Sequence, residues 1–112
     1  ARYWTTTYPS TALLPMAALV ETVKREDFSG VKLPALFYYS IDDLVVDPAD
    51  TNAFADGWGG AVTVRHPQLS NGDDKYAHII AGDIVSPHQT DFAVDAILWW
   101  LSTHHGWAES GR

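Results

Sequence analysis

Only two short runs in this chain have the composition of buried β-strands, and helical patterns stand before, between and after them. The first run is Leu33–Tyr39 and the second is Ala61–His66. The first reads as a buried parallel strand rather than a half-exposed one, because it does not alternate cleanly between apolar and polar residues. The order is therefore helix, strand, helix, strand, helix. Such α/β alternation predicts parallel strands joined by a helical crossover.

The helices are predicted from apolar spacing and from residues that favour helix ends. The first is expected over about Leu13–Arg25, with Ser29-Gly30 as its stop. Asp47 as a cap and Pro48 at the first helical position predict a second helix that reaches about Asp56. The third is expected to begin at the capping box Ser86-Pro87-His88-Gln89, with Thr90 as a second possible cap, and to stop at Gly106.

The chain has 112 residues, enough for a single domain. We expect an irregular lead-in over residues 1–10, where Tyr3, Trp4 and Tyr8 could belong to the end of a cap region. Two strands are few for an α/β layer, because they leave a sheet edge and apolar helix surface without partners. Residues 1–112 therefore read as one partial domain, completed by further strands outside them or by oligomerisation.

Composition narrows the classes of partner. A net charge of −7 disfavours contact with phosphate backbones, so nucleic acid is not expected as a partner. No apolar run approaches the roughly 18 residues of a membrane-spanning helix, so the chain is not expected to be transmembrane. There is no cysteine, which excludes disulfides and cysteine-ligated zinc within the chain. A cytoplasmic location is our expectation, although a periplasmic one is also compatible.

Chemistry-bearing side chains follow both predicted strands. Asp43 comes shortly after the first strand, and His78 comes after the second strand and its loop. Parallel strands bring their carboxyl ends to one edge of a sheet, so the two loops should meet there. A carboxylate that accepts the Nδ1 proton of a histidine orients the ring as a general base and stabilises its charged form. Asp43 and His78 are accordingly the candidate acid and base.

Other residues compete for these roles. Asp42 is the alternative acid and His66 the alternative base, although His66 ends a strand and is better explained as structural. His88 lies in a helix's first turn, and Ser86 is expected to cap that helix rather than to act as a nucleophile. The pair His104-His105 lacks a third metal ligand at useful spacing. The carboxylates do not match a calcium-binding EF-hand loop; they are Asp42, Asp43, Asp47 and Asp50.

The segment Leu33–Pro48 resembles the late strand and acid-bearing turn of the α/β-hydrolase family, in which Gly-x-x-Asp-x-x-Val and then Pro follow an apolar strand. Here the pattern falls on Ser40, Asp43, Val46 and Pro48, with Ser40 in place of the glycine. The segment Ala77–Pro87 resembles the histidine region of bacterial esterase or lysophospholipase-like members. The resemblance covers about residues 8–103 and implies the C-terminal portion of an α/β-hydrolase fold.

By that resemblance, Asp43 and His78 are the acid and base of a Ser-His-Asp triad whose serine lies upstream, because the chain has no Gly-x-Ser-x-Gly motif. The expected substrate is a carboxylic ester, a lipid or a related small acyl compound, with no cofactor and no metal. The chain alone should be inactive. Expected partners are the missing N-terminal part or a second copy. The alternative is a non-catalytic α/β binding or assembly module; a flavodoxin- or thioredoxin-like domain is disfavoured by the lack of a Gly-rich phosphate loop and of cysteine.

Overall fold

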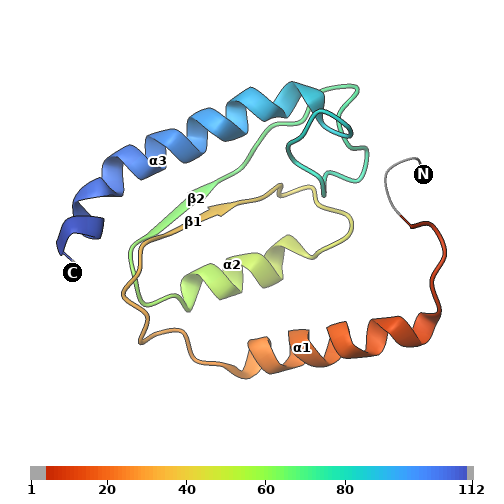
Figure 1. Ribbon diagram of the computed structural model, residues 1–112, viewed down its shortest axis with the longest axis horizontal. Coiled ribbons are helices and arrows are strands. Elements are labelled where there is room, and N and C mark those ends of the chain that lie inside the picture. The colour runs from red at the N-terminus through yellow and green to blue at the C-terminus, as the bar shows by residue number, and fades with distance from the viewer. Residues whose placement is uncertain (1–4, 111–112) are drawn as a thin grey trace.

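Two parallel strands form the centre of the molecule, and helices lie on both sides of them (Figure 1). The computed structural model describes the backbone of residues 5–110 and the side chains of residues 5–104. Strands β1 (Ala35–Tyr38) and β2 (Val62–Arg65) pair in register from Ala35 opposite Val62 to Tyr38 opposite Arg65. Helix α2 (Pro48–Asp56) connects them, as the α/β pattern predicts for a parallel pair.

The first two α-helices lie where the sequence predicts them. Helix α1 (Leu13–Arg25) follows a 3₁₀ turn, η1 (Ser10–Ala12), and α2 begins at Pro48 after Asp47. The Asp47 side chain accepts the backbone N–H of Ala49 at 2.9 Å, which is the expected cap. The expected stop of α1 at Ser29-Gly30 is wrong, because the backbone is already extended at Glu26, beyond Arg25.

The start and the end of the last helix differ from the prediction. A 3₁₀ turn, η2 (Pro87–Gln89), precedes α3, which covers Thr90–Ser110. Ser86 makes no side-chain cap to that turn, so the predicted capping box is not formed. The hydroxyl of Thr90 donates to Asp83 and accepts from Gly82 N–H instead. The helix also continues through Gly106, because glycine weakens a helix by about 1 kcal/mol without forbidding it.

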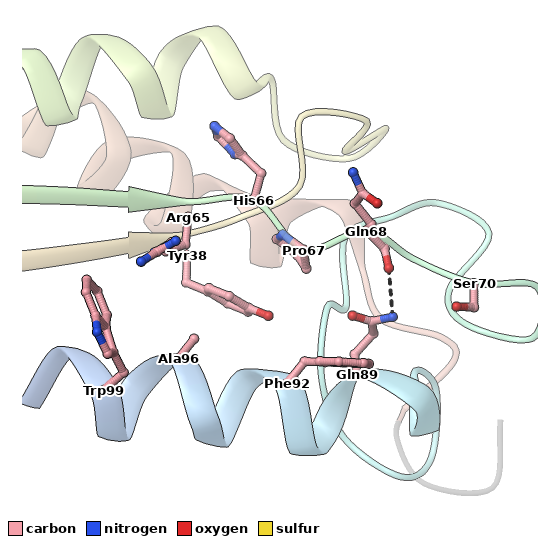
Figure 2. Close-up of a pocket in the computed structure, with 10 residues that line it drawn as sticks. All are labelled: Tyr38, Arg65, His66, Pro67, Gln68, Ser70, Gln89, Phe92, Ala96 and Trp99. Carbon is pink, nitrogen blue, oxygen red and sulfur yellow. Dashed lines mark hydrogen bonds between the residues drawn. The ribbon is translucent and has the colours of Figure 1, made fainter.

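The two faces of the sheet pack against different helices. On the α2 face, Phe54 of α2 and Trp58 of the loop after it contact Phe37 of β1. Phe28, from the loop before β1, packs against Phe54 and Trp58 and completes the aromatic cluster. On the α3 face lie Tyr38 and Arg65, with the Arg65 guanidinium 4.4 Å from the ring centre of Trp99 (Figure 2). Side chains alternate between faces along a strand, so one four-residue strand serves both layers.

The apolar core is thin. Within the described side chains, the buried apolar residues are Ala55 and Ala93. No residue of α1 is buried, and its apolar side chains are exposed, with Leu14 at 67% and Leu19 at 63%. Strand β1 pairs with β2 on one edge, and no other described strand lies on the opposite edge. An unpaired edge and an uncovered apolar helix are what the two-strand pattern predicts.

Candidate active site

The loop after β1 is folded around Asp43. Its Oδ1 accepts the backbone N–H groups of Val45 at 2.8 Å and of Val46 at 2.9 Å. Ser40, which stands where the family pattern has glycine, is buried, and its hydroxyl accepts the N–H of Asp42 at 3.1 Å. Ser40 has no positive φ, so this turn does not require the conformational freedom of glycine. The serine stabilises the turn that presents Asp43.

The second oxygen of Asp43 holds His78. The distance from Asp43 Oδ2 to His78 Nδ1 is 2.9 Å, and the side chains are 11% and 41% exposed, respectively. Burial opposes ionisation of Asp43, but the hydrogen bonds from Val46, His78 and Val45 outweigh it and lower the pKa of the carboxyl below its usual value. The carboxylate is therefore ionised at neutral pH and accepts a proton from Nδ1.

This contact determines the tautomer of His78. With the proton on Nδ1, the neutral ring carries its lone pair on Nε2. Within the described side chains, the hydrogen bonds of the His78 ring are made by Nδ1 alone. The ring is oriented by a carboxylate and partly open to solvent, and its Nε2 is available to accept a proton. This is the geometry of a general base with its orienting acid.

The backbone beside His78 is unusual. Ala77 has φ of +53°, and it is the one described residue other than glycine with a positive φ. For alanine this conformation costs on the order of 1–3 kcal/mol, so the surrounding contacts must hold it. Leu44 N–H also donates to Tyr76 C=O at 2.9 Å, which joins the loop of Asp43 directly to the loop of His78.

The structure thus brings Asp43 and His78 together as the sequence predicts, and their catalytic role stays a prediction. Asp42 is exposed on the same turn, and it is the Asp43 carboxylate, not that of Asp42, that bonds to His78. His66 Nδ1 lies 3.0 Å from Tyr39 C=O, and its ring meets Tyr39 edge-on, with no carboxylate beside it. That bond to the backbone agrees with the structural role expected for His66.

Sequence reasoning missed a second histidine–carboxylate pair. His88 Nδ1 lies 3.1 Å from Asp73 Oδ1, and the Asp73 side chain is fully covered. Burial opposes ionisation here too, but hydrogen bonds from Ser70, Gln89 and His88 lower the pKa of Asp73 to about 2. The sequence carries no signal for this pair, because Asp73 lies in a polar loop and His88 is expected in the first turn of a helix.

The remaining candidates have local partners. The buried Ser86 hydroxyl bonds to Ile79 C=O and Asp74 N–H, which replaces the predicted capping role. His104 Nδ1 is 2.9 Å from Trp100 C=O, and the side chain of His105 lies outside the described residues. Among the described residues, no three His, Asp or Glu side chains gather in a metal-binding arrangement. No described helix is long and apolar enough to cross a bilayer.

A pocket of about 520 Å³ lies apart from the pair, between the ends of the strands and α3 (Figure 2). Tyr38, Arg65, Gln89 and Trp99 line it, and Asp43 and His78 do not. In Figure 2 the ring of His66 points away from α3, to the other side of β2 from Tyr38. The pocket therefore does not hold a substrate against the candidate base.

Comparisons of the chain with models of protein families, with curated proteins and with solved structures find no match.

Proposed function

We propose that this chain supplies the acid and the base of a serine hydrolase that acts on carboxylic esters or related acyl compounds. The observation that carries the proposal is the 2.9 Å contact between Asp43 Oδ2 and His78 Nδ1. It joins two residues 35 positions apart, each in the loop beyond a different parallel strand. In open parallel sheets, this edge is where functional side chains gather.

In the proposed reaction, His78 Nε2 removes the proton from a serine hydroxyl as its oxygen attacks the ester carbonyl. The ionised Asp43 stabilises the resulting imidazolium without taking its proton. His78 then donates that proton to the departing alcohol, which leaves a serine acyl-enzyme. Water, activated by the same base, hydrolyses the acyl-enzyme and restores the serine. Every step uses the ring atom that Asp43 leaves free.

The proposal places the serine and the oxyanion-hole donors outside residues 1–112. Within the described residues, the most buried serines, Ser40 and Ser86, are hydrogen-bonded within their own loops and form no hydrogen bond with the His78 ring. The free edge of β1 and the exposed apolar face of α1 support a larger sheet in the complete domain. In this proposal, residues 1–112 form the C-terminal portion of an α/β-hydrolase fold, as the resemblance of the acid turn and the histidine loop implies.

The test is hydrolysis of p-nitrophenyl esters by the product of the complete reading frame that encodes residues 1–112. We expect Asp43→Asn to lower kcat about 10⁴-fold and His78→Gln to lower it at least as much. Two matched substitutions, Asp42→Asn and His88→Gln, should leave kcat close to that of the parent. Equal losses in Asp42→Asn and Asp43→Asn, or turnover by residues 1–112 alone, would contradict the proposal.

A non-catalytic assembly module is the second candidate, favoured by the uncovered side chains of α1. It predicts a discrete oligomer of the chain, but it does not require an ordered Asp43–His78 contact. The contact therefore favours the hydrolase. Gel filtration separates the two only together with the ester assay: a stable dimer that remains inactive in the complete product would favour the assembly module.

A further inference from the structure

The loop that carries His78 is built around one residue, Asp74. Its carboxylate accepts the backbone N–H groups of Tyr76 at 3.1 Å, of His78 at 3.1 Å and of Ile79 at 2.9 Å. Its main-chain carbonyl accepts the N–H of Ala77 at 2.9 Å. Four consecutive backbone donors, from residue 76 to residue 79, therefore end on the same residue, with His78 among them.

Ser86 closes this loop from the other side. Its hydroxyl accepts Asp74 N–H at 3.0 Å and donates to Ile79 C=O, so it bonds to both ends of the segment 74–79. Ser86 is completely buried. Its own backbone is fixed too, because Ser86 N–H donates to Gly82 C=O and Ser86 C=O accepts Gln89 N–H, just before α3. The hydroxyl thus connects the His78 loop to the start of a long helix.

The same segment also contacts the loop of the candidate acid. Tyr76 C=O accepts Leu44 N–H at 2.9 Å, one residue after Asp43. The segment that Asp74 and Ser86 fix is therefore held against the acid turn at one end and carries the His78 ring two residues later. A shift of this backbone changes the Nδ1-to-Oδ2 distance directly, because the bond to Asp43 is the one hydrogen bond of the His78 ring within the described side chains.

We propose that Asp74 and Ser86 are positioning residues for His78, which fix the strained backbone that aims its ring at Asp43. They touch no reacting atom in this scheme and act only through His78. The inference rests on the proposed function for its catalytic meaning. The structural part of the inference, that the Asp43–His78 bond depends on Asp74 and Ser86, does not depend on the proposed function.

An ionised aspartate suits this role better than asparagine. The two carboxylate oxygens of Asp74 face backbone N–H groups, so both must be acceptors. Asparagine has one acceptor oxygen, and its amide would direct N–H against N–H on one side. Asp74→Asn is therefore nearly isosteric and still disturbs the loop. Ser86→Ala removes one buried hydroxyl and leaves Asp74 N–H and Ile79 C=O without that partner.

The direct readout is the Nδ1 proton of His78, observed by NMR in the product of the complete reading frame that encodes residues 1–112. Bonded to Asp43, it should give a downfield resonance that Asp43→Asn abolishes. We expect Asp74→Asn and Ser86→Ala to abolish or strongly broaden it while amide dispersion shows a folded chain. Asp91→Asn, an exposed carboxylate on the first turn of α3, is the matched control and should retain the resonance. If Asp74→Asn does not fold, Ser86→Ala carries the measurement.

An unchanged resonance in folded Asp74→Asn and Ser86→Ala would overturn the positioning role while leaving the proposed function intact. Absence of the resonance from the folded parent protein would overturn the Asp43–His78 pair, and both proposals with it. In the ester assay, Asp74→Asn should lower kcat by roughly tenfold to hundredfold with little change in KM, as small displacements of a catalytic group do. That loss should largely disappear in an Asp43→Asn background, because both substitutions act on one bond.

Discussion

Among the described side chains, two histidines bond through Nδ1 to an aspartate, and their surroundings distinguish them. Asp43 commits one oxygen to its own turn and the other to His78. Asp73 binds both the ring and the backbone N–H of His88, together with Ser70 N–H and the Gln89 amide. The first pair joins two loops at the sheet edge, whereas the second anchors a polar loop to the start of α3. We therefore expect the Asp73–His88 pair to stabilise the fold rather than to take part in catalysis.

That assignment predicts an acid dependence of folding. The pKa of Asp73 is about 2 in the folded chain, below the value near 3.9 of an unfolded aspartate. As the pH falls from about 4 towards 2, the unfolded state binds more protons, so the free energy of unfolding decreases. Asp73→Asn should flatten this part of the profile and lower stability at neutral pH. Urea midpoints measured by circular dichroism between pH 2 and pH 6 check it.

Of the site residues, the sequence could predict those that follow strands. Asp43 and His78 were predictable because each follows a predicted strand, and parallel strands share an edge. The strands themselves are not buried as expected, since β1 is half-buried and β2 is largely exposed. Asp74 was not predictable, because its role depends on the direction of four backbone N–H groups in an irregular loop. The pattern Ser-Pro-x-Gln predicts a helix cap at Ser86, but in the folded chain its hydroxyl bonds to Asp74 N–H and Ile79 C=O instead.

At the scale of elements, two loops approach so closely that only glycine fits. A Cβ on Gly59 would lie 1.8 Å from Ser29 C=O, and one on Gly60 would lie 2.0 Å from Leu33 C=O. This contact brings the loop after α2 against the loop before β1. There Trp58 Nε1 donates to Leu33 C=O at 2.7 Å and its ring stacks on Phe28. The approach positions the aromatic cluster on one face of the sheet.

Gly59→Ala should therefore lower the free energy of unfolding by about 1–3 kcal/mol or more, because backbone and not a flexible side chain must move. Gly30→Ala is the matched control: a Cβ there meets no atom within 4 Å, so its effect should be small. Chemical denaturation of both variants makes the comparison. If the two substitutions lowered the free energy of unfolding equally, the close approach at Gly59 would not be the cause of the loss.

Element boundaries were predictable where the signals are local. Asp47 and Pro48 determine the start of α2 through a cap and a preset φ, and both act within a few residues. The strands are shorter than predicted, at Ala35–Tyr38 and Val62–Arg65, because a strand ends where its partner's ladder ends. The predicted end of α3 at Gly106 is wrong, because glycine lowers helix propensity without ending the helix.

At the scale of the whole molecule, the chain is expanded. Its radius of gyration is 16.5 Å, whereas a compact domain of this size has about 13 Å. Large apolar side chains remain exposed on both flanking layers, including Leu19 at 63% on α1 and Phe92 at 66% on α3. A layer exposed in this way needs further apolar surface to be stable. In the proposed function, the part of the protein that covers these side chains also contains the catalytic serine.

The measurement that tests the central claim most directly is the site labelled by a fluorophosphonate in the product of the complete reading frame. The proposed function predicts one labelled serine, outside residues 1–112, and labelling that is strongly slowed by His78→Gln and by Asp43→Asn but not by His88→Gln. No labelling, a label on a serine within residues 1–112, or a rate indifferent to His78 would contradict the claim that Asp43 and His78 are the acid and base of a serine hydrolase.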